Sequence, residues 1–268
     1  MSAAVGVGRG HELWSLLAIA GRDVTKLLRD RTRLGVSLAF PILIFAGLGS
    51  ILQPTVGRAT GLNAITLVFT GVLAATLFQS AAAGMMSLIE DRETDFAREM
   101  FVAPISRVTI VAGKVVGESL VALVQGVGIV AFSLVFGVRY DLPNLLLIVP
   151  VSIGSALVGA AFGLATLAAL PNQRAALQIM PFVILPQYFL AGVVVPLRGL
   201  PAYLDGLGWA MPMRYPVNLT RAAFYLGRPG YRGAVAENPL LDVAVLVVLF
   251  VLCLLLGALV FEYRERTR

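Results

Sequence analysis

The sequence has little charge for its length. Only 13% of its 268 residues are charged, whereas ordinary globular chains contain about 25%. Apolar residues make up 58%, above the usual level of about 45–50%, and the mean hydropathy is +0.87. A soluble domain of this size has no core large enough to bury so much apolar surface. Lipid is therefore the expected solvent, and a soluble enzyme is disfavoured.

Histidine and cysteine are almost absent. Cys253 is the single cysteine, which excludes an intrachain disulfide and a cysteine-based metal cluster. His11 is the single histidine, so a serine–histidine–carboxylate site at membrane depth is not expected. The sequence also lacks a G-x-x-x-x-G-K-[ST] run, and it therefore offers no P-loop for ATP. If the function consumes ATP, another polypeptide supplies the nucleotide site.

Long apolar runs are what the sequence does contain. A hydrocarbon core about 30 Å thick needs about 20 residues of helix at 1.5 Å per residue. Six segments meet this length: about 33–52, 63–89, 106–137, 144–170, 175–195 and 241–261. The fold class predicted is an all-α integral membrane protein that forms one transmembrane domain over residues 1–268. A short outer loop, roughly Gln53 to Leu62, is expected after the first span.

Lysine and arginine predict the orientation, because cytoplasmic loops carry more of them than external loops do. With six spans and both termini in the cytoplasm, 14 of the 21 fall on the cytoplasmic side and seven outside. Both termini are therefore expected to be cytoplasmic. The net charge of +6 then reflects topology and lipid headgroups, and no nucleic-acid partner is expected.

An amphipathic helix is predicted over about 11–32, before the first span. Leucine, alanine and valine recur there at steps of three and four residues, with Arg22, Asp23 and Lys26 among the residues that fill the other positions. Such a helix is typical of the inner membrane surface. The alternative is a plain cytoplasmic extension of the first span.

Proline and glycine punctuate the region before the last span. Two short re-entrant helices are predicted over about 200–227, where the alternative is a long irregular loop. Their aromatic residues are expected at the outer membrane interface. These aromatic residues are Tyr203, Trp209, Phe224 and Tyr225. The last span is expected to begin with Asn238 as N-cap and Pro239 as its first helical residue.

Few polar residues lie within the spans. The third segment is about 48 Å of helix, which exceeds the hydrocarbon by about 18 Å, so Lys114 and Glu118 are expected near the inner interface. A snorkelling pair is favoured over a proton relay. Asp242 is expected in the first turn of a helix, where the dipole favours a carboxylate. Neutral polar residues suit bonds between helices or contacts with a moderately polar substrate, and the candidates for a substrate pathway are Gln79, Gln125, Gln178 and Gln187.

Two motifs carry a resemblance to a known family. The stretch EDRETDFAREMFVAPISRVTIVAGKVVGESLVALVQ, from Glu90 to Gln125, resembles the permease subunits of type-2 ATP-binding-cassette (ABC) exporters. The matching positions are Glu90, Arg92, Glu93, Pro104, Ile105, Ser106, Arg107, Gly113 and Lys114. A second match, from Leu185 to Tyr225, has its matching positions at Leu190 to Gly192, Pro196, Leu200, Pro201, Met211, Pro212, Tyr215 and Arg221. One departure is DFARE, where family members often have Gly-Thr-Leu-Glu.

The resemblance implies a four-subunit complex. Two permease chains, identical or different, would pair in the membrane lipid on two cytoplasmic ABC ATPase subunits, which bind the ATP and Mg. Residues of about 90–104 resemble the coupling helix that docks on the ATPase, and the outer helices resemble an extracellular gate. The docking residues carried over are Arg92, Glu93, Phe96, Met100 and Phe101. This chain itself is expected to have no enzyme activity and no cofactor.

The function implied is export of a hydrophobic or amphiphilic substrate, a drug, antibiotic or lipid, across a bacterial cytoplasmic membrane. The Ala-, Gly-, Val- and Arg-rich composition resembles that of high-GC bacteria and favours a role in multidrug efflux or antibiotic resistance. Export of a polysaccharide or glycolipid is an alternative. A proton-coupled transporter or channel lacks a buried charge network in the sequence, and a lipid-modifying membrane enzyme lacks clustered histidines or carboxylates.

Overall fold

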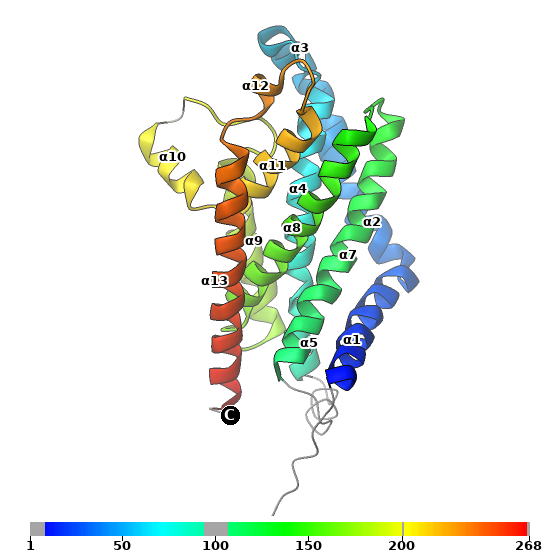
Figure 1. Ribbon diagram of the computed structural model, residues 1–268, viewed down its shortest axis with the longest axis vertical. Coiled ribbons are helices and arrows are strands. Elements are labelled where there is room, and N and C mark those ends of the chain that lie inside the picture. Colours follow the sequence, from blue (N-terminus) through cyan, green and yellow to red (C-terminus); the bar gives the residue numbers. More distant parts are fainter. Residues whose placement is uncertain (1–8, 94–106, 200, 267–268) are drawn as a thin grey trace, which may run out of the picture.

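The computed structural model describes residues 9–93, 107–199 and 201–266, and every regular element within them is helical (Figure 1). The elements in chain order are α1 (Arg9–Arg29), α2 (Arg31–Leu43), the π-helix η1 (Ile44–Leu48), α3 (Gly49–Thr60), α4 (Ala64–Gly84), α5 (Met86–Glu93), α7 (Arg107–Val135), α8 (Leu142–Leu167), α9 (Gln173–Leu190), α10 (Ala202–Trp209), α11 (Arg214–Tyr225), α12 (Tyr231–Ala234) and α13 (Pro239–Arg266).

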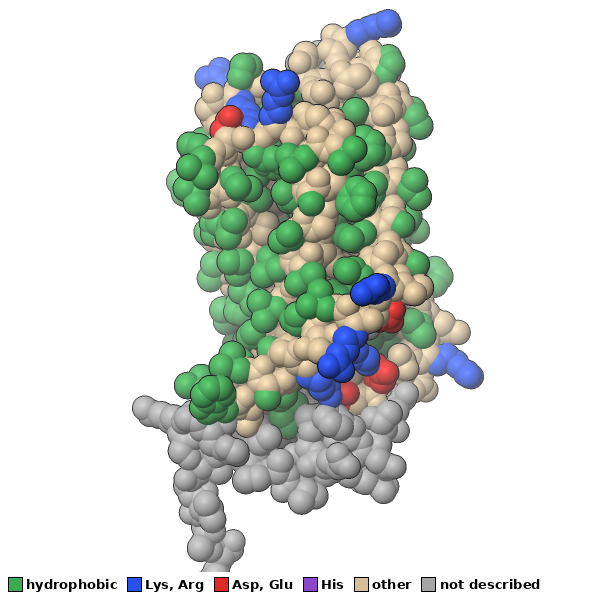
Figure 2. All heavy atoms as spheres, turned by 90° about the vertical axis from the view of Figure 1, so that its right-hand side faces the viewer, with side chains coloured by type: hydrophobic (Ala, Val, Ile, Leu, Met, Phe, Trp, Pro, Cys, Tyr) green, Lys and Arg blue, Asp and Glu red, His purple; other side chains and the backbone are tan. Residues whose placement is uncertain are grey.

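The long helices run side by side and give the molecule two ends (Figure 1). The α1 end holds α1, α5 and the C-terminal end of α13, and the α3 end holds α3, α10, α11 and α12. Figure 2 shows hydrophobic side chains over the middle of one face, with charged side chains near both ends. This distribution is the one expected of a protein whose middle lies in lipid.

Five described helical stretches are long and apolar enough to cross a membrane. They are Leu34–Arg58, Ala64–Asp91, Val108–Val135, Leu142–Leu167 and Pro239–Val260. The predicted segment 175–195 forms α9, but it is not among the five, because the polar residues near both ends of this 18-residue helix lower its hydropathy. The structure thus confirms a multi-span helical fold, and the count of six stays a prediction.

The prediction of an outer loop at roughly Gln53 to Leu62, after the first span, is wrong. Helices α2, η1 and α3 form one nearly continuous helical run that ends at Thr60, where Gly61 takes a left-handed conformation (φ +70°) as the C-cap. Gln53 lies within this run, and its side-chain oxygen accepts a hydrogen bond from the Ala64 amide at 2.7 Å. The polar residues expected in a loop are therefore helical and anchor the start of α4.

Helix α4 is the centre of the bundle. The most apolar part of its span is 78% buried inside the protein, against 6% for the span of α13. Glycines allow α8 to lie directly on it: a Cβ at Gly159 would stand 2.3 Å from the Phe78 carbonyl, and one at Gly163 would stand 2.3 Å from the Ala82 carbonyl. Small residues thus permit close packing of α8 on α4.

Helix α11 is buried in the protein, in contrast to the predicted placement of its aromatic residues at an outer membrane interface. All 12 of its residues are buried, and it packs against α4, α8 and α13. Phe224 and Tyr225 consequently belong to the core, whereas Tyr203 on α10 is exposed. The physical reason is that protein groups satisfy the polar atoms of α11: Asn144 of α8 donates to the carbonyls of Ala223, Phe224 and Leu226.

The predicted start of the last span is confirmed. Helix α13 begins at Pro239, and the side chain of Asn238 accepts a hydrogen bond from the Leu240 amide at 3.0 Å. Asp242 lies in the first turn of the helix, as expected. It is fully buried and accepts a hydrogen bond from Asn218 of α11, so it joins α13 to α11.

Candidate functional site

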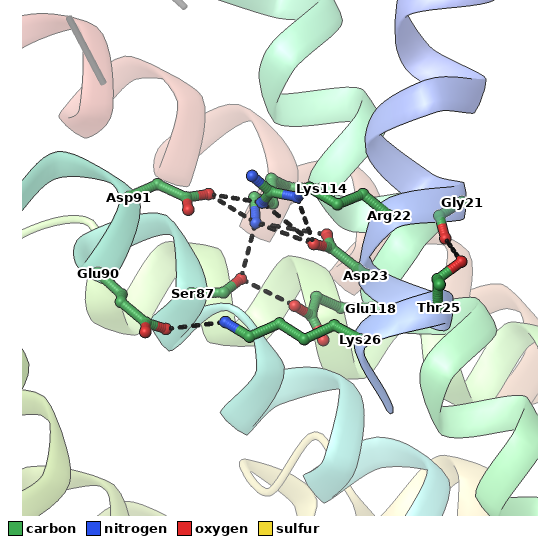
Figure 3. A network of polar contacts seen from close by, with 10 residues as sticks. All are labelled: Gly21, Arg22, Asp23, Thr25, Lys26, Ser87, Glu90, Asp91, Lys114 and Glu118. Carbon is green, nitrogen blue, oxygen red and sulfur yellow. Dashed lines mark hydrogen bonds and ion pairs between the residues drawn. The ribbon is translucent and has the colours of Figure 1, made fainter. Parts of the chain in front are cut away.

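A buried cluster of charged side chains joins three helices at the α1 end (Figure 3). At its centre is Lys114 of α7, whose side chain has no exposed surface. Its Nζ lies 2.7 Å from Asp91 Oδ2 of α5 and 3.3 Å from Asp23 Oδ2 of α1, and it donates to Ser87 Oγ at 3.1 Å. We call Asp23, Ser87, Asp91 and Lys114 the Lys114 cluster.

Two further side chains extend this cluster. Arg22 Nη2 contacts Asp23 at 3.1 Å and Asp91 at 3.0 Å, so both carboxylates meet two cations. Burial opposes the charge of Arg22, but the hydrogen bond and charge of Asp91 outweigh it, with Asp23 adding to them, and the pKa of Arg22 is raised. Glu118 of α7 accepts a hydrogen bond from Ser87 at 2.8 Å. A lysine buried this deeply is tolerated because carboxylates and a hydroxyl surround it.

The snorkelling prediction for Lys114 and Glu118 is wrong. The two side chains do lie one turn apart on α7, but Lys114 points inward to carboxylates of α1 and α5 (Figure 3). Asp23, assigned above to the polar face of the amphipathic helix, lies on its buried face between Ala20 and Leu27. The spacing of three and four residues in Ala20, Asp23 and Leu27 is the signal that would have placed this carboxylate inward.

A pocket of about 480 Å³ lies between the first span and α9. Its apolar walls include Phe40 of α2 and Phe189 of α9, both largely exposed on the outside of the bundle. It shares Phe40, Gln79, Ala83 and Met86 with a second pocket of about 290 Å³, whose other lining residues include Thr76, Glu118 and Gln125. We call these two pockets the lateral groove.

The charged end of the lateral groove reaches the Lys114 cluster. A third pocket of about 190 Å³ shares Gly84 and Glu118 with the second, and its lining includes Asp23 and Ser87. Gly84 leaves room for this carboxylate, since a Cβ there would stand 2.0 Å from Glu118 Oε2 and the glutamate side chain would have to move. The lining therefore changes from apolar near α9, through neutral polar groups, to charged groups near α1.

The four predicted pathway residues divide into two pairs. Gln79 and Gln125 both line the lateral groove, and Gln79 accepts a hydrogen bond from Tyr188 at 2.8 Å. Gln178 lies exposed on α9 and does not line these pockets. Gln187 is buried, donates to the Val183 carbonyl and accepts from the Met213 amide, so it holds α9 to the start of α11.

The predicted gate residues meet a second ion-pair cluster at the α3 end. Arg214 of α11 contacts Asp205 of α10 at 2.8 Å and Glu237 before α13, and its guanidinium lies over the ring of Trp209 at 4.8 Å. The hydrogen bond from Arg214 lowers the pKa of Asp205. Of the four candidates, Tyr203 and Trp209 are on α10, and Phe224 and Tyr225 lie inside the bundle.

The predicted coupling residues lie at or beyond the edge of the described structure. Arg92 and Glu93 occupy the last two positions of α5, and nothing is described of their side chains. Phe96, Met100 and Phe101 lie outside the described residues. Among the residues that are described, no three His, Cys, Asp or Glu side chains gather as metal ligands.

Several apolar helices and a groove between them define a multi-pass membrane protein. Residues 15–225 match the family described as ABC-2 type transporter. The match covers most of the chain, and the protein therefore belongs to this family of ABC transporter permeases. Membrane subunits of this family work with an ABC ATPase and are generally not enzymes themselves.

Curated relatives agree with this family. The chain is 25% identical to Nodulation protein J of Rhizobium leguminosarum bv. viciae over 233 residues, which are 85% of this chain and 86% of the relative. It is 26% identical over 144 residues to YbhR of Escherichia coli (strain K12), described as a probable multidrug ABC transporter permease, which covers 52% of this chain and 38% of the relative. Ycf38 of Cyanophora paradoxa, described as a putative transport permease, is 23% identical over 77% of this chain and 72% of the relative.

Proposed function

We propose that this chain is the membrane subunit of an ATP-driven exporter in a bacterial cytoplasmic membrane. Two permease chains, the same or different, pair with two cytoplasmic ABC ATPase subunits that bind ATP and Mg. The family match over residues 15–225, in a chain without a P-loop sequence, is the observation that carries the proposal. A subunit of this kind receives its energy from its partner.

Six spans and a cytoplasmic α1 end complete the topology. Helix α9 crosses the membrane in addition to the five long spans, and with six crossings both termini lie on the same side of the membrane. The excess of lysine and arginine on that side supports this orientation. The α3 end, with α10 and α11, is then extracellular and forms the outer gate.

The connection from about 90 to 104 docks on the ATPase. Apolar Phe96, Met100 and Phe101 provide an edge that fits a groove, and Arg92 and Glu93 supply charges that select the partner. The adjacent Lys114 cluster supports this assignment, because it joins α5, which leads into the connection, to α7, which follows it.

The substrate is a hydrophobic or amphiphilic molecule such as a drug or a lipid. The lateral groove supports this class, since its lining changes from apolar at α9 to polar at Gln79 and Gln125 and to charged beside Glu118. A molecule with an apolar body and a polar head matches that gradient. The description of YbhR as a multidrug permease points to the same class.

Co-purification and transport in reconstituted vesicles test the function. The permease and its ATPase are expected to purify as a complex that moves a fluorescent amphiphile only with ATP. Replacing Phe96, Met100 and Phe101 together with Asp should release the ATPase or abolish transport per ATP hydrolysed, because carboxylates do not enter an apolar groove. Replacing the same three residues with Leu keeps an apolar edge and serves as the matched control, which should retain the ATPase and normal coupling. Normal coupling in the triple Asp variant would refute the docking assignment.

A further inference from the structure

We propose that Lys114 is the positioning residue that makes α1, α5 and α7 move as one body when the ATPase acts on the connection between α5 and α7. The inference rests on the proposed function. It assigns a role to residues that bind neither substrate nor ATP in that function. It is carried by the contacts of one buried lysine with carboxylates on two other helices.

The first contact, between Lys114 and Asp91, joins the two helices on either side of the connection. Helix α5 ends at Glu93 and α7 begins at Arg107, so residues 94–106 link the two helices. Asp91 lies near the last position of α5, and Lys114 lies in the second turn of α7. Their ion pair at 2.7 Å therefore spans the base of the connection. A push on residues 94–106 displaces α5 and α7 together, because separating them would leave a fully buried ammonium group without its nearest partner.

The second contact, between Lys114 and Asp23, holds α1 on α7. Asp23 lies 3.3 Å from Lys114, and around it the two helices touch closely. A Cβ at Gly117 would lie 3.0 Å from the Ala20 Cα, and one at Gly113 would lie 3.2 Å from the Ile19 Cβ. The glycines of α7 provide the close approach, and the ion pair selects the register. Helix α1 is thereby held on α7 by packing and by charge.

The third step leads to the lateral groove. Only Asp30 separates α1 from α2, so movement of α1 is transmitted to the first span. Val36, Ser37 and Phe40 of α2 line the groove, opposite Glu118 and Gln125 of α7. Both groups of wall residues thus belong to helices connected with Lys114. Movement that starts at the ATPase reaches the substrate groove through this cluster.

The chain offers a matched control. Lys26 and Glu90 also join α1 to α5, but they lie 3.6 Å apart and their side chains are 57% and 45% exposed. An exposed pair of this kind is screened by water and salt and contributes little. If any ion pair between these helices sufficed, Lys26 and Lys114 would be equivalent.

Transport per ATP hydrolysed in the reconstituted complex tests the inference. Lys114→Met is expected to keep ATP hydrolysis but to lower transport per ATP about tenfold, within the range of measured coupling between sites. Lys26→Met should stay close to wild type. Lys114→Arg keeps a cation between Asp23 and Asp91 and should retain far more coupling than Lys114→Met, which a role of side-chain volume alone would not predict. Wild-type coupling in Lys114→Met, or a folded Lys114→Arg variant as poorly coupled as Lys114→Met, would overturn the proposal.

A disulfide cross-link reports how firmly α1 is held on α7, and it needs no transport assay. In a Cys253→Ala background, Ile19→Cys and Gly113→Cys bring two cysteine Cβ atoms to 3.2 Å, slightly closer than the usual ~3.5–4.5 Å across a disulfide. Oxidation should be fast with Lys114 present and slower in Lys114→Met, and the formed disulfide should restore coupling to that variant. If Lys114→Met does not fold, Asp23→Asn replaces it, since this change keeps the Asp91 partner and removes the one on α1. Equal cross-linking with and without the partner would overturn the role of α1. Failure of wild-type export would instead refute the proposed function and leave this readout intact.

Discussion

At the scale of single residues, polar side chains inside this bundle fall into groups that hold helices together and groups that line open space. Gln187 bonds to the backbone of two elements, and Asn144 binds three carbonyls at the end of α11. Gln125, by contrast, faces the lateral groove. Residue type alone does not separate these roles, because all of these side chains carry the same amide group.

Gln125→Leu is expected to slow transport of a polar-headed amphiphile several-fold with little loss of thermal stability. The reason is that a leucine keeps the volume of the wall but removes a hydrogen-bonding group from the groove, a contribution of about 1 kcal/mol. Transport rates in vesicles, with melting in detergent alongside, provide the measurement. Gln178→Leu changes an exposed glutamine on α9 and is the control. Equal rates for all three proteins would remove the groove from the substrate pathway.

At the scale of helices, close backbone packing and ion-pair clusters position the elements. The backbone of α8 approaches that of α4 at two glycines one turn apart, Gly159 and Gly163. At the α3 end, Arg214 is the link between α10, α11 and the residue Glu237 that precedes α13. The first contact is rigid because it joins two backbones, whereas the second depends on charge.

Gly159→Ala is expected to destabilise the protein by about 1–3 kcal/mol, because its methyl group would stand 2.3 Å from the Phe78 carbonyl and force α4 and α8 apart. Gly21→Ala on α1 is the matched control: no atom lies within 4 Å of the added Cβ, so the higher helix propensity of alanine should stabilise by up to about 1 kcal/mol. Melting temperatures in detergent would show opposite shifts. A stable Gly159→Ala protein would mean that α4 and α8 are farther apart.

The attachment of α10 is expected to weaken in acid. Arg214 lowers the pKa of Asp205, so this ion pair contributes above the ordinary aspartate pKa and is lost as the pH falls through the lowered value. Because the ordinary value is about 3.9, loosening should appear only below about pH 4. Hydrogen exchange of an α10 peptide, compared between wild type and Asp205→Asn, reports it. The Asp205→Asn variant should exchange fast at every pH. Identical exchange-versus-pH profiles for the two proteins would mean that the Arg214–Asp205 ion pair does not hold α10.

At the scale of the whole molecule, the direction of the chain through the membrane depends on α9. The other five spans qualify by length and hydropathy, but α9 is short, has two internal prolines and carries polar residues near its ends. If α9 crosses, the two ends of the chain share one side of the membrane, whereas with five spans the C-terminus lies on the side opposite the N-terminus.

Cysteine labelling decides this point. In a Cys253→Ala background, Arg198→Cys, after α9, should react with an impermeant maleimide on intact cells. Arg174→Cys, in the first turn of α9, should react only after permeabilisation. Both positions are exposed, so burial does not explain a difference. Labelling of both from the same side would mean that α9 does not cross and that the chain has five spans.

The sequence by itself determined the solvent and the class of this protein. Runs of about 20 apolar residues have no stable place except lipid, and helices satisfy their backbone polar groups without help from other segments. Local signals were also sufficient where the chemistry is local: Asn238 caps the helix that starts at Pro239, and the small residues around Gly159 allow close packing. The family motifs lie in the sequence as well, and the match over residues 15–225 confirmed the family that they suggested.

Only the tertiary structure decided which polar groups meet. Lys114 lies 91 residues from Asp23 along the chain, and no local periodicity specifies that α1 packs on α7 and brings the two side chains together. The same holds for Phe224 and Tyr225, whose burial follows from α4, α8 and α13 surrounding α11. A helix pattern states which face is apolar, but the neighbour that covers that face is chosen by the packing of the whole chain. The buried charges at the base of the bundle therefore became recognisable as a cluster only once their helices were placed side by side.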